Sequence, residues 1–129
     1  NNNYNIQKKE ISKTNFPTTD AFYQDGRSVF QFATGTVPVQ MKTLLARNQL
    51  NETNLAAIIC HQANLRIIEK ISQTLMISMD KFPHTVEKFG NTSSAGIPLT
   101  LATMGHSNQP ILLTGFGAGL AYGSILIRM

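Results

Sequence analysis

The chain has 129 residues, a length that suits one domain built around one hydrophobic core. Hydrophobic residues make up 42% of it, which argues against a disordered chain, and its single cysteine excludes an internal disulfide framework. The net charge of +4 comes from 11 basic and 7 acidic residues with no block of Lys or Arg, so the composition does not favour nucleic-acid binding.

Residues 1–26 are rich in Asn, Thr and Lys and end in Asp25-Gly26, which predicts a loop or excursion without a motif. The opening NNNYNIQKKE has no initiator Met and no apolar stretch of the kind a signal peptide needs, so we expect a fragment or a processed chain. We assign the single domain to residues 27–129 and, from the lone cysteine, expect a cytoplasmic protein.

A helix is predicted after Arg27, because apolar residues recur there at a helical period. Pro38 falls inside this pattern and must kink or restart the helix, since proline has no N–H and its ring clashes with the preceding turn. The apolar positions are Val29, Phe30, Ala33, Val37, Met41, Leu44 and Leu45.

Leu55 to Cys60 is an unbroken apolar run, as in a strand that is buried on both faces of a parallel sheet. A second helix is predicted from Gln62 to about Ser78, with Ile67 and Ile71 on its apolar arc. Asn64 falls in the middle of that arc, and either a backbone group at the helix end or a site must satisfy its amide.

Charge is distributed unevenly along the chain. Arg66 and Lys70, four residues apart, share the solvent-facing side of the second helix and form either a solvated face or a docking patch for an acidic partner. Phe89 to Ile127 contains no Asp, Glu, Lys or Arg, so we expect this third of the chain to be interior or interface. Ile111 to Ile127 is slightly shorter than the roughly 20 residues of a membrane span and is interrupted by glycines, so two buried strands with a glycine turn fit better.

The remaining elements are predicted from shorter signals. They are a strand candidate at Thr85–Glu87, a turn at Gly90-Asn91, a helix capped by Thr92-Ser93-Ser94 and running to about Met104, a loop at His106–Pro110, and strands at 111–116 and 120–127. Alternating strands and helices closed by a hairpin predict an α/β layered domain.

Cys60 and His61 are neighbours, yet residues adjacent on a strand point to opposite faces, so a hydrogen-bonded Cys–His pair is not expected. Cys60 is predicted to be a small buried hydrophobic residue. His61 lies where a buried strand ends and a helix begins, the sheet edge at which α/β proteins bind ligands. The three histidines and the cysteine match no metal-ligand spacing, so no metal site is predicted.

The glycine cluster GFGAGLAYG begins at Gly115 and does not satisfy the dinucleotide-binding fingerprint. Tyr122 stands where that fingerprint needs a glycine, and a strand follows where it needs a helix. A tight strand-turn-strand that aims backbone N–H groups into a site is the better use of these glycines.

Four segments stand out in order along the chain: Gly26-Arg27-Ser28-Val29-Phe30, HQANLRII from His61, Gly90-Asn91-Thr92-Ser93 and Gly115-Phe116-Gly117-Ala118-Gly119. Together they resemble the C-terminal half of β-ketoacyl-acyl-carrier-protein synthase III, from about residue 25 to the end of the chain. The resemblance implies a thiolase-like fold, in which two duplicated halves form a five-layer α-β-α-β-α sandwich, and it implies a homodimer.

The same resemblance implies an acyltransferase that condenses an acyl-CoA primer with malonyl-acyl-carrier protein and needs no cofactor. A cysteine of the N-terminal half would hold the acyl group as a thioester. His61 and Asn91 correspond to the family's two N–H donors, which stabilise the oxyanion that forms when the malonyl thioester loses carbon dioxide. The backbone N–H of Ala118 corresponds to a donor in a second oxyanion hole.

Binding residues are also implied by the resemblance. An acidic carrier protein should favour the charges of Arg66 and Lys70. The residues implied are Gln62, Ala63, Asn64, Leu65, Arg66 and Lys70 for the carrier protein, and Gly26, Phe30 and Asn64 for the pantetheine arm of the CoA thioester.

Two features depart from the family. Cys60 stands where the family has proline or an apolar residue, and no segment resembles the family's nucleophilic cysteine helix. We therefore expect half of a site, active only with the N-terminal half, and expect a central strand of the sheet to lie upstream of residue 1. The alternative is a non-catalytic thiolase-fold module that binds a carrier protein or a partner subunit, although such a module would not need both His61 and Asn91.

Overall fold

The computed structural model describes residues 25–129, so the loop predicted over residues 1–26 lies almost entirely outside the described residues. A π-helical turn joins the first two helices, and short 3-10 turns lie between other elements. The α-helices and strands are α2 (Gly26–Gln31), α3 (Val37–Arg47), β1 (Ala57–Cys60), α4 (Leu65–Leu75), α5 (Val86–Phe89), α6 (Gly96–Ala102), β2 (Ile111–Gly117) and β3 (Ala121–Ile127).

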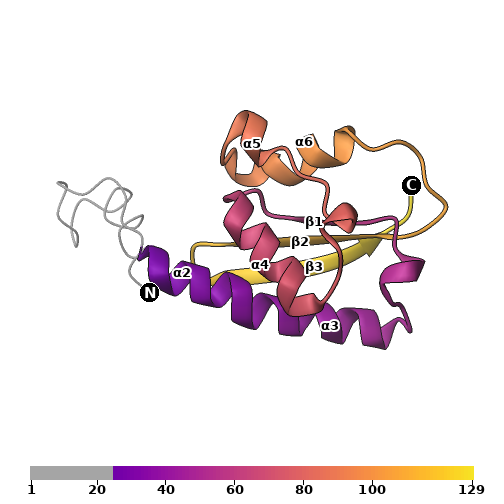
Figure 1. Ribbon diagram of the computed structural model, residues 1–129, viewed down its shortest axis with the longest axis horizontal. Helices are drawn as coiled ribbons and strands as arrows, with labels where there is room; N and C mark the ends of the chain where they lie inside the picture. The colour runs from indigo at the N-terminus through magenta and orange to yellow at the C-terminus, as the bar shows by residue number, and fades with distance from the viewer. Residues whose placement is uncertain (1–24) are drawn as a thin grey trace, which may run out of the picture.

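The three strands of the described residues form one mixed sheet in the order β1-β2-β3 (Figure 1). β1 pairs in parallel with β2, with Ala57 opposite Ile111, and β2 pairs antiparallel with β3, with Ile111 opposite Ile127. Helices α3 and α4 cover one face of the sheet, and α6 packs against the other face of β1. The predicted α/β layers and closing hairpin are confirmed.

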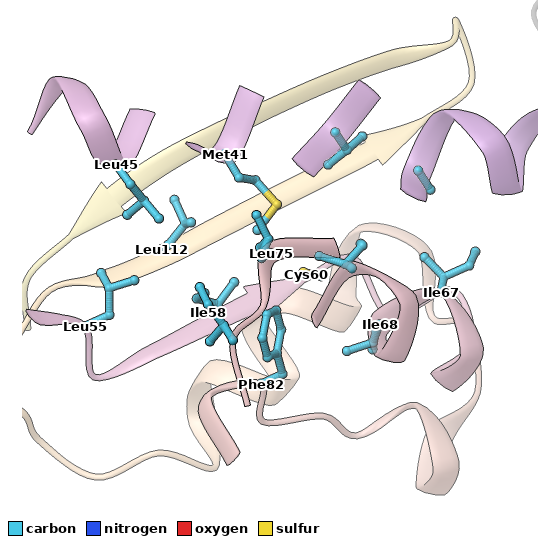
Figure 2. Packing of buried hydrophobic residues seen from close by; sticks show 14 of the residues in the cluster. Met41, Leu45, Leu55, Ile58, Cys60, Ile67, Ile68, Leu75, Phe82 and Leu112 are labelled. Atoms are coloured by element: carbon cyan, nitrogen blue, oxygen red, sulfur yellow. The ribbon is translucent and has the colours of Figure 1, made fainter. Parts of the chain in front are cut away.

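β1 is buried on both faces, as its unbroken apolar run predicts. Ile58 and Cys60 belong to the main core with α3 and α4, while Ala57 and Ile59 belong to a smaller core against α6. Figure 2 shows Phe82, from the segment after α4, beside Ile58 in the main core. The short strand therefore holds both helical layers together through apolar burial.

The helix predicted after Arg27 continues from α2 through the π-helical turn at Phe32–Thr36 into α3. Val37 N–H donates to Phe32 O, a bond spanning five residues that defines the wider turn. Pro38 then lies in the first turn of α3, where a missing N–H is tolerated. The interruption predicted at Pro38 takes the form of a local change in helix type.

Helix α4 is shorter at both ends than the helix predicted there. Asn64 has an extended backbone and its Oδ1 accepts a hydrogen bond of 2.9 Å from Ile67 N–H, so Asn64 is the N-cap and the helix starts after it. Met76 ends the helix with a left-handed backbone, at φ 55°. The prediction that Asn64 lies on the apolar arc of the helix is wrong. Of the two partners expected for its amide, a backbone group at the helix end or a site, the structure shows the backbone group.

The strand candidate at Thr85–Glu87 is wrong, because this segment opens helix α5. Lys88 N–H and Phe89 N–H both donate to Thr85 O at 3.0 Å, which is a helical pairing. Three residues of alternating polarity are too few to distinguish a strand from the first turn of a helix.

The cap of the next helix also differs from its prediction. Thr92 makes no capping hydrogen bond; instead Asn91 Oδ1 accepts from Ser93 N–H at 2.9 Å. A 3-10 turn at Ser93–Ala95 follows and leads into α6. The Asn91 side chain therefore organises the backbone that enters this helix.

β2 and β3 form the predicted hairpin, and no helix within residues 25–129 combines the length and hydropathy needed to cross a bilayer. Ser124 Oγ donates to Gln40 Oε1 at 2.6 Å and pairs with Thr114 Oγ1 at 2.8 Å, which ties the hairpin to α3. The outer edge of β3 pairs with no other described strand, and Ile125 and Tyr122 are 57% and 45% exposed.

The unpaired edge of β3 and its exposed apolar residues predict that an isolated 1–129 chain aggregates or requires a partner chain. Size-exclusion chromatography with thermal unfolding tests this, and a monomer with a cooperative melt would contradict it. Ile125→Lys should raise the monomer fraction. Met76→Lys adds the same charge at an 85% exposed position outside the sheet and should not do so.

Candidate functional site

His61 is held at the carboxyl end of β1 by its own backbone. Its N–H donates to Thr114 O at 2.8 Å, so the parallel pairing with β2 continues one residue beyond the strand. Its ring meets the ring of Phe116 edge to face, with centroids 5.2 Å apart and planes at 86°. A β2 side chain thus orients the imidazole on a rigid part of the sheet.

The ring of His61 is half-buried, and burial lowers its pKa below the ordinary value of 6.5. The imidazole is therefore mainly neutral at pH 7, with one N–H donor and one lone pair. No hydrogen bond among the described residues uses this ring, so its N–H is available to a ligand.

Asn91 lies between α5 and α6, directly after Gly90. Gly90 has φ +67°, a left-handed conformation that glycine adopts without strain. Because Asn91 Oδ1 accepts from Ser93 N–H, the Nδ2 group is the end of the amide left as a donor. The residue is exposed, and no hydrogen bond among residues 25–129 uses its Nδ2 group.

Cys60 is packed in the main core at 1% exposure, and burial raises the pKa of its thiol to about 12. A buried, protonated thiol is a poor nucleophile. The prediction that Cys60 is a buried hydrophobic residue and no partner of His61 is confirmed.

Gln62 corrects an expectation, because its side chain is 1% exposed and cannot reach the surface of a carrier protein. Its Nε2 donates to Cys60 O at 2.8 Å, and its Oε1 accepts from Thr85 N–H at 2.9 Å and Val86 N–H at 3.2 Å. The amide is thus used inside the protein, between the end of β1 and the start of α5.

The rest of the segment implied for the carrier protein is divided between core and surface. Leu65 is partly buried against the main core, Ala63 is half-buried, and Asn64 caps α4. Arg66 and Lys70 are exposed on α4, which leaves both cations accessible to a partner.

The other implied site residues lie at the same end of the sheet. Ala118 is exposed in the turn between β2 and β3, next to Gly119, whose φ of +149° suits only glycine. Gly26 and Phe30 lie on α2, where Phe30 packs partly against the main core. Figure 1 shows α2, the start of α4, the carboxyl end of β1 and this turn at one end of the molecule.

Metal-binding side chains do not gather in the described part of the chain: residues 25–129 contain no group of three or more His, Cys, Asp or Glu side chains that could hold an ion. His84 instead contacts Phe82 O at 2.9 Å and Glu87 Oε1 at 2.7 Å. An open groove of about 460 Å³ lies between α3 and Tyr122 of β3, away from His61.

Two contributors to the site are missed by reasoning from the residues. Phe116 reaches His61 only through the parallel pairing of β1 with β2, in which partners such as Ala57 and Ile111 are 54 positions apart in sequence. The family resemblance implies a carrier-protein contact for Gln62, whereas two of its hydrogen-bond partners lie 23 and 24 residues away inside the protein. The sequence signal for an internal Gln62 is its place two residues after the end of a buried strand.

The layers of helices, the mixed sheet and the turn beside a strand-end histidine define an α/β protein with the architecture of the C-terminal half of the thiolase-like fold. Residues 45–129 match the family model described as 3-oxoacyl-[acyl-carrier-protein (ACP)] synthase III C terminal, and the chain belongs to this family.

Individual relatives agree with this assignment. The chain is 58% identical over 120 residues to beta-ketoacyl-[acyl-carrier-protein] synthase III 1 of Lactiplantibacillus plantarum, which covers 92% of this chain and 37% of that protein. It is 34% identical over 132 residues to the synthase III of Streptococcus suis, covering 96% of this chain and 41% of that one. The crystal structure of 3-oxoacyl-(acyl carrier protein) synthase III from Pseudomonas aeruginosa matches with a TM-score of 0.79 and 30% identity, covering 87% and 37%. The chain thus spans about two-fifths of the length of these relatives.

The burial of His61 predicts that its pKa lies below 6.5 in the folded protein. Because the folded form then binds this proton less tightly than the unfolded chain does, the stability linked to neutral His61 is present above about pH 6.5 and is lost as the pH falls. An NMR titration of the His61 ring in the full-length protein, compared with the same signal in denaturant, measures the shift. A folded-state pKa at or above the denatured value would contradict it.

Proposed function

We propose that this chain is the C-terminal part of a 3-oxoacyl-acyl-carrier-protein synthase III-type acyltransferase. In the proposed reaction an acyl-CoA primer and malonyl-acyl-carrier protein undergo decarboxylative condensation, and His61 and Asn91 act as oxyanion donors. The nucleophilic cysteine belongs to the N-terminal half, so this chain alone is inactive.

Electrons move in two stages in the proposed reaction. The bond between the malonyl carboxylate and the α-carbon breaks, carbon dioxide leaves, and the electron pair moves onto the thioester oxygen as an enolate. The enolate carbon then attacks the acyl thioester on the cysteine, whose carbonyl is held by the Ala118 N–H, and the cysteine thiolate leaves. Two preorganised N–H donors lower the barrier of the first stage most, because that is where the oxyanion forms.

The observation that carries this proposal is that both side chains are left as donors. Burial keeps the His61 imidazole neutral, and Ser93 N–H occupies Asn91 Oδ1, so the Asn91 Nδ2 group is free to donate. A binding module without catalysis would not need a partly buried histidine at the end of a strand together with an amide oriented as a donor. This supports an enzyme over the non-catalytic alternative.

The proposal also includes the binding partners of the full protein, its oligomeric state and its location in the cell. Arg66 and Lys70 on α4 are the contact for an acidic carrier protein, while Gly26, Phe30 and Asn64 lie along the pantetheine arm of the CoA thioester. The substrates supply all the chemistry, so no cofactor takes part. The full protein is a cytoplasmic homodimer in which an N-terminal half completes the five-layer sandwich.

Replacing His61 by Ala in the full-length protein should lower the rate of malonyl-thioester decarboxylation by about 10²-fold or more, the loss expected for an oxyanion donor. Release of carbon dioxide from radiolabelled malonyl-acyl-carrier protein measures it. His106→Ala is the matched control, since His106 is exposed in the loop before β2. Wild-type decarboxylation in His61→Ala would overturn the proposed function and favour the binding module.

Replacing Arg66 by Glu should raise the KM for malonyl-acyl-carrier protein about tenfold or more, since like charges at an interface cost several kcal/mol and about 1.4 kcal/mol is tenfold. The KM for malonyl-CoA should change little, and raising the salt concentration should reduce the difference. Lys42→Glu, an exposed position on α3, is the control. An equal effect on both substrates would argue against a carrier contact at Arg66.

A further inference from the structure

We propose that Gln62 is a positioning residue that sets the place of Asn91 relative to His61. This inference rests on the proposed function of those two donors. The structure gives Gln62 an internal task, since its side chain is almost completely buried directly after His61. Within residues 25–129, every hydrogen bond that its side chain makes goes to the backbone.

The amide of Gln62 joins the two segments that carry the donors. Its Nε2 donates to Cys60 O, the residue before His61, at 2.8 Å. Its Oε1 accepts from Thr85 N–H and Val86 N–H at 2.9 and 3.2 Å, at the start of the short helix that leads to Asn91. One side chain thus connects two segments that are 23 and 24 residues apart in sequence.

The C-terminal end of the segment that contains Asn91 also packs against Gln62. Gly96 begins α6, and a Cβ placed on it would lie 2.9 Å from Gln62 Cβ and 3.1 Å from Gln62 Cγ. These distances allow no side chain at position 96 unless α6 or Gln62 moves. The residues from Val86 to Gly96, with Asn91 between them, are therefore fixed at both ends by one side chain.

A second set of buried contacts also holds the start of α5 and helix α6 together. Thr100 Oγ1 donates to Gly96 O at 2.9 Å and lies 2.8 Å from Thr85 Oγ1, which must then be the donor in that pair. The start of α5 is thus hydrogen-bonded both to Thr100 of α6 and to Gln62, while Gly96 at the start of α6 packs closely against Gln62. Oxyanion donors require such support, because a misplacement of about 1 Å can cost about 10²-fold in rate.

The test uses the full-length enzyme and Gln62→Met, which keeps the length of the side chain and removes its hydrogen bonds. The kcat for malonyl-thioester decarboxylation should fall about 10- to 100-fold, with KM within about threefold of wild type, because the transition state and not substrate binding is affected. In an Asn91→Ala background the same change should lower kcat by less than about twofold, since two residues that act together are not additive. Gln109→Met is the control: it makes the same replacement at an exposed glutamine whose side chain donates to Thr53 O, and it should leave kcat unchanged.

If Gln62→Met fails to fold, Gly96→Ala tests the same contacts from the side of α6. The added Cβ displaces Gln62 or α6, while alanine has a higher helix propensity than glycine. This variant should also lower kcat, while Gly35→Ala, a helical glycine with no atom within 4 Å of its added Cβ, should not. A lower melting temperature with unchanged kcat, or an equal loss of kcat in the Asn91→Ala background, would overturn the positioning role. If His61→Ala and Asn91→Ala themselves decarboxylate at the wild-type rate, the proposed function fails instead.

Discussion

The parallel pairing of β1 with β2 is the interaction on which the rest of the structure depends. It joins segments that lie about 50 residues apart in sequence, and it continues past the end of β1 through His61 N–H and Thr114 O. Parallel strands end at the same edge, so the histidine and the turn after β2 are brought to one end of the sheet without any contact between their side chains. The cores on the two faces of β1 then make this short strand rigid.

The two proposed donors are held by different physical means. His61 is fixed by a backbone hydrogen bond and by the Phe116 ring, both of which belong to the sheet. Asn91 lies in an irregular segment and depends on side chains for its position, above all on the buried amide of Gln62. A buried amide that loses a partner costs about 1–3 kcal/mol, so satisfying all of its hydrogen bonds restricts the segment to one arrangement.

Elements with strong local signals are predictable from the sequence, and those that depend on distant contacts are not. The buried strand ending at Cys60 and the hairpin follow from apolar runs and glycines, and the helix before Pro38 from its period. The start of α4 is misplaced by the periodicity because an Asn64 cap overrides it, and the strand candidate at Thr85 fails because Gln62, far away in sequence, satisfies the first amides of a helix. His61 and Asn91 were identified through family resemblance, since neither has a spacing that marks an oxyanion site by itself.

The absence of charged residues from Phe89 to Ile127 has a different physical reason in the buried part of this stretch and in its exposed part. Its inward-facing part contributes Leu112 to the main core and Ile111 to the smaller one, where charged side chains would be costly to desolvate. Its outward-facing part includes Ile125 on β3, whose outer edge pairs with no other described strand, and a surface exposed in the whole protein would favour polar residues there. The chain spans about two-fifths of its relatives, so a covering segment is available in proteins of that length. The same scarcity of charge benefits the site, because an oxyanion donor is more effective where no competing ion or ordered water screens it.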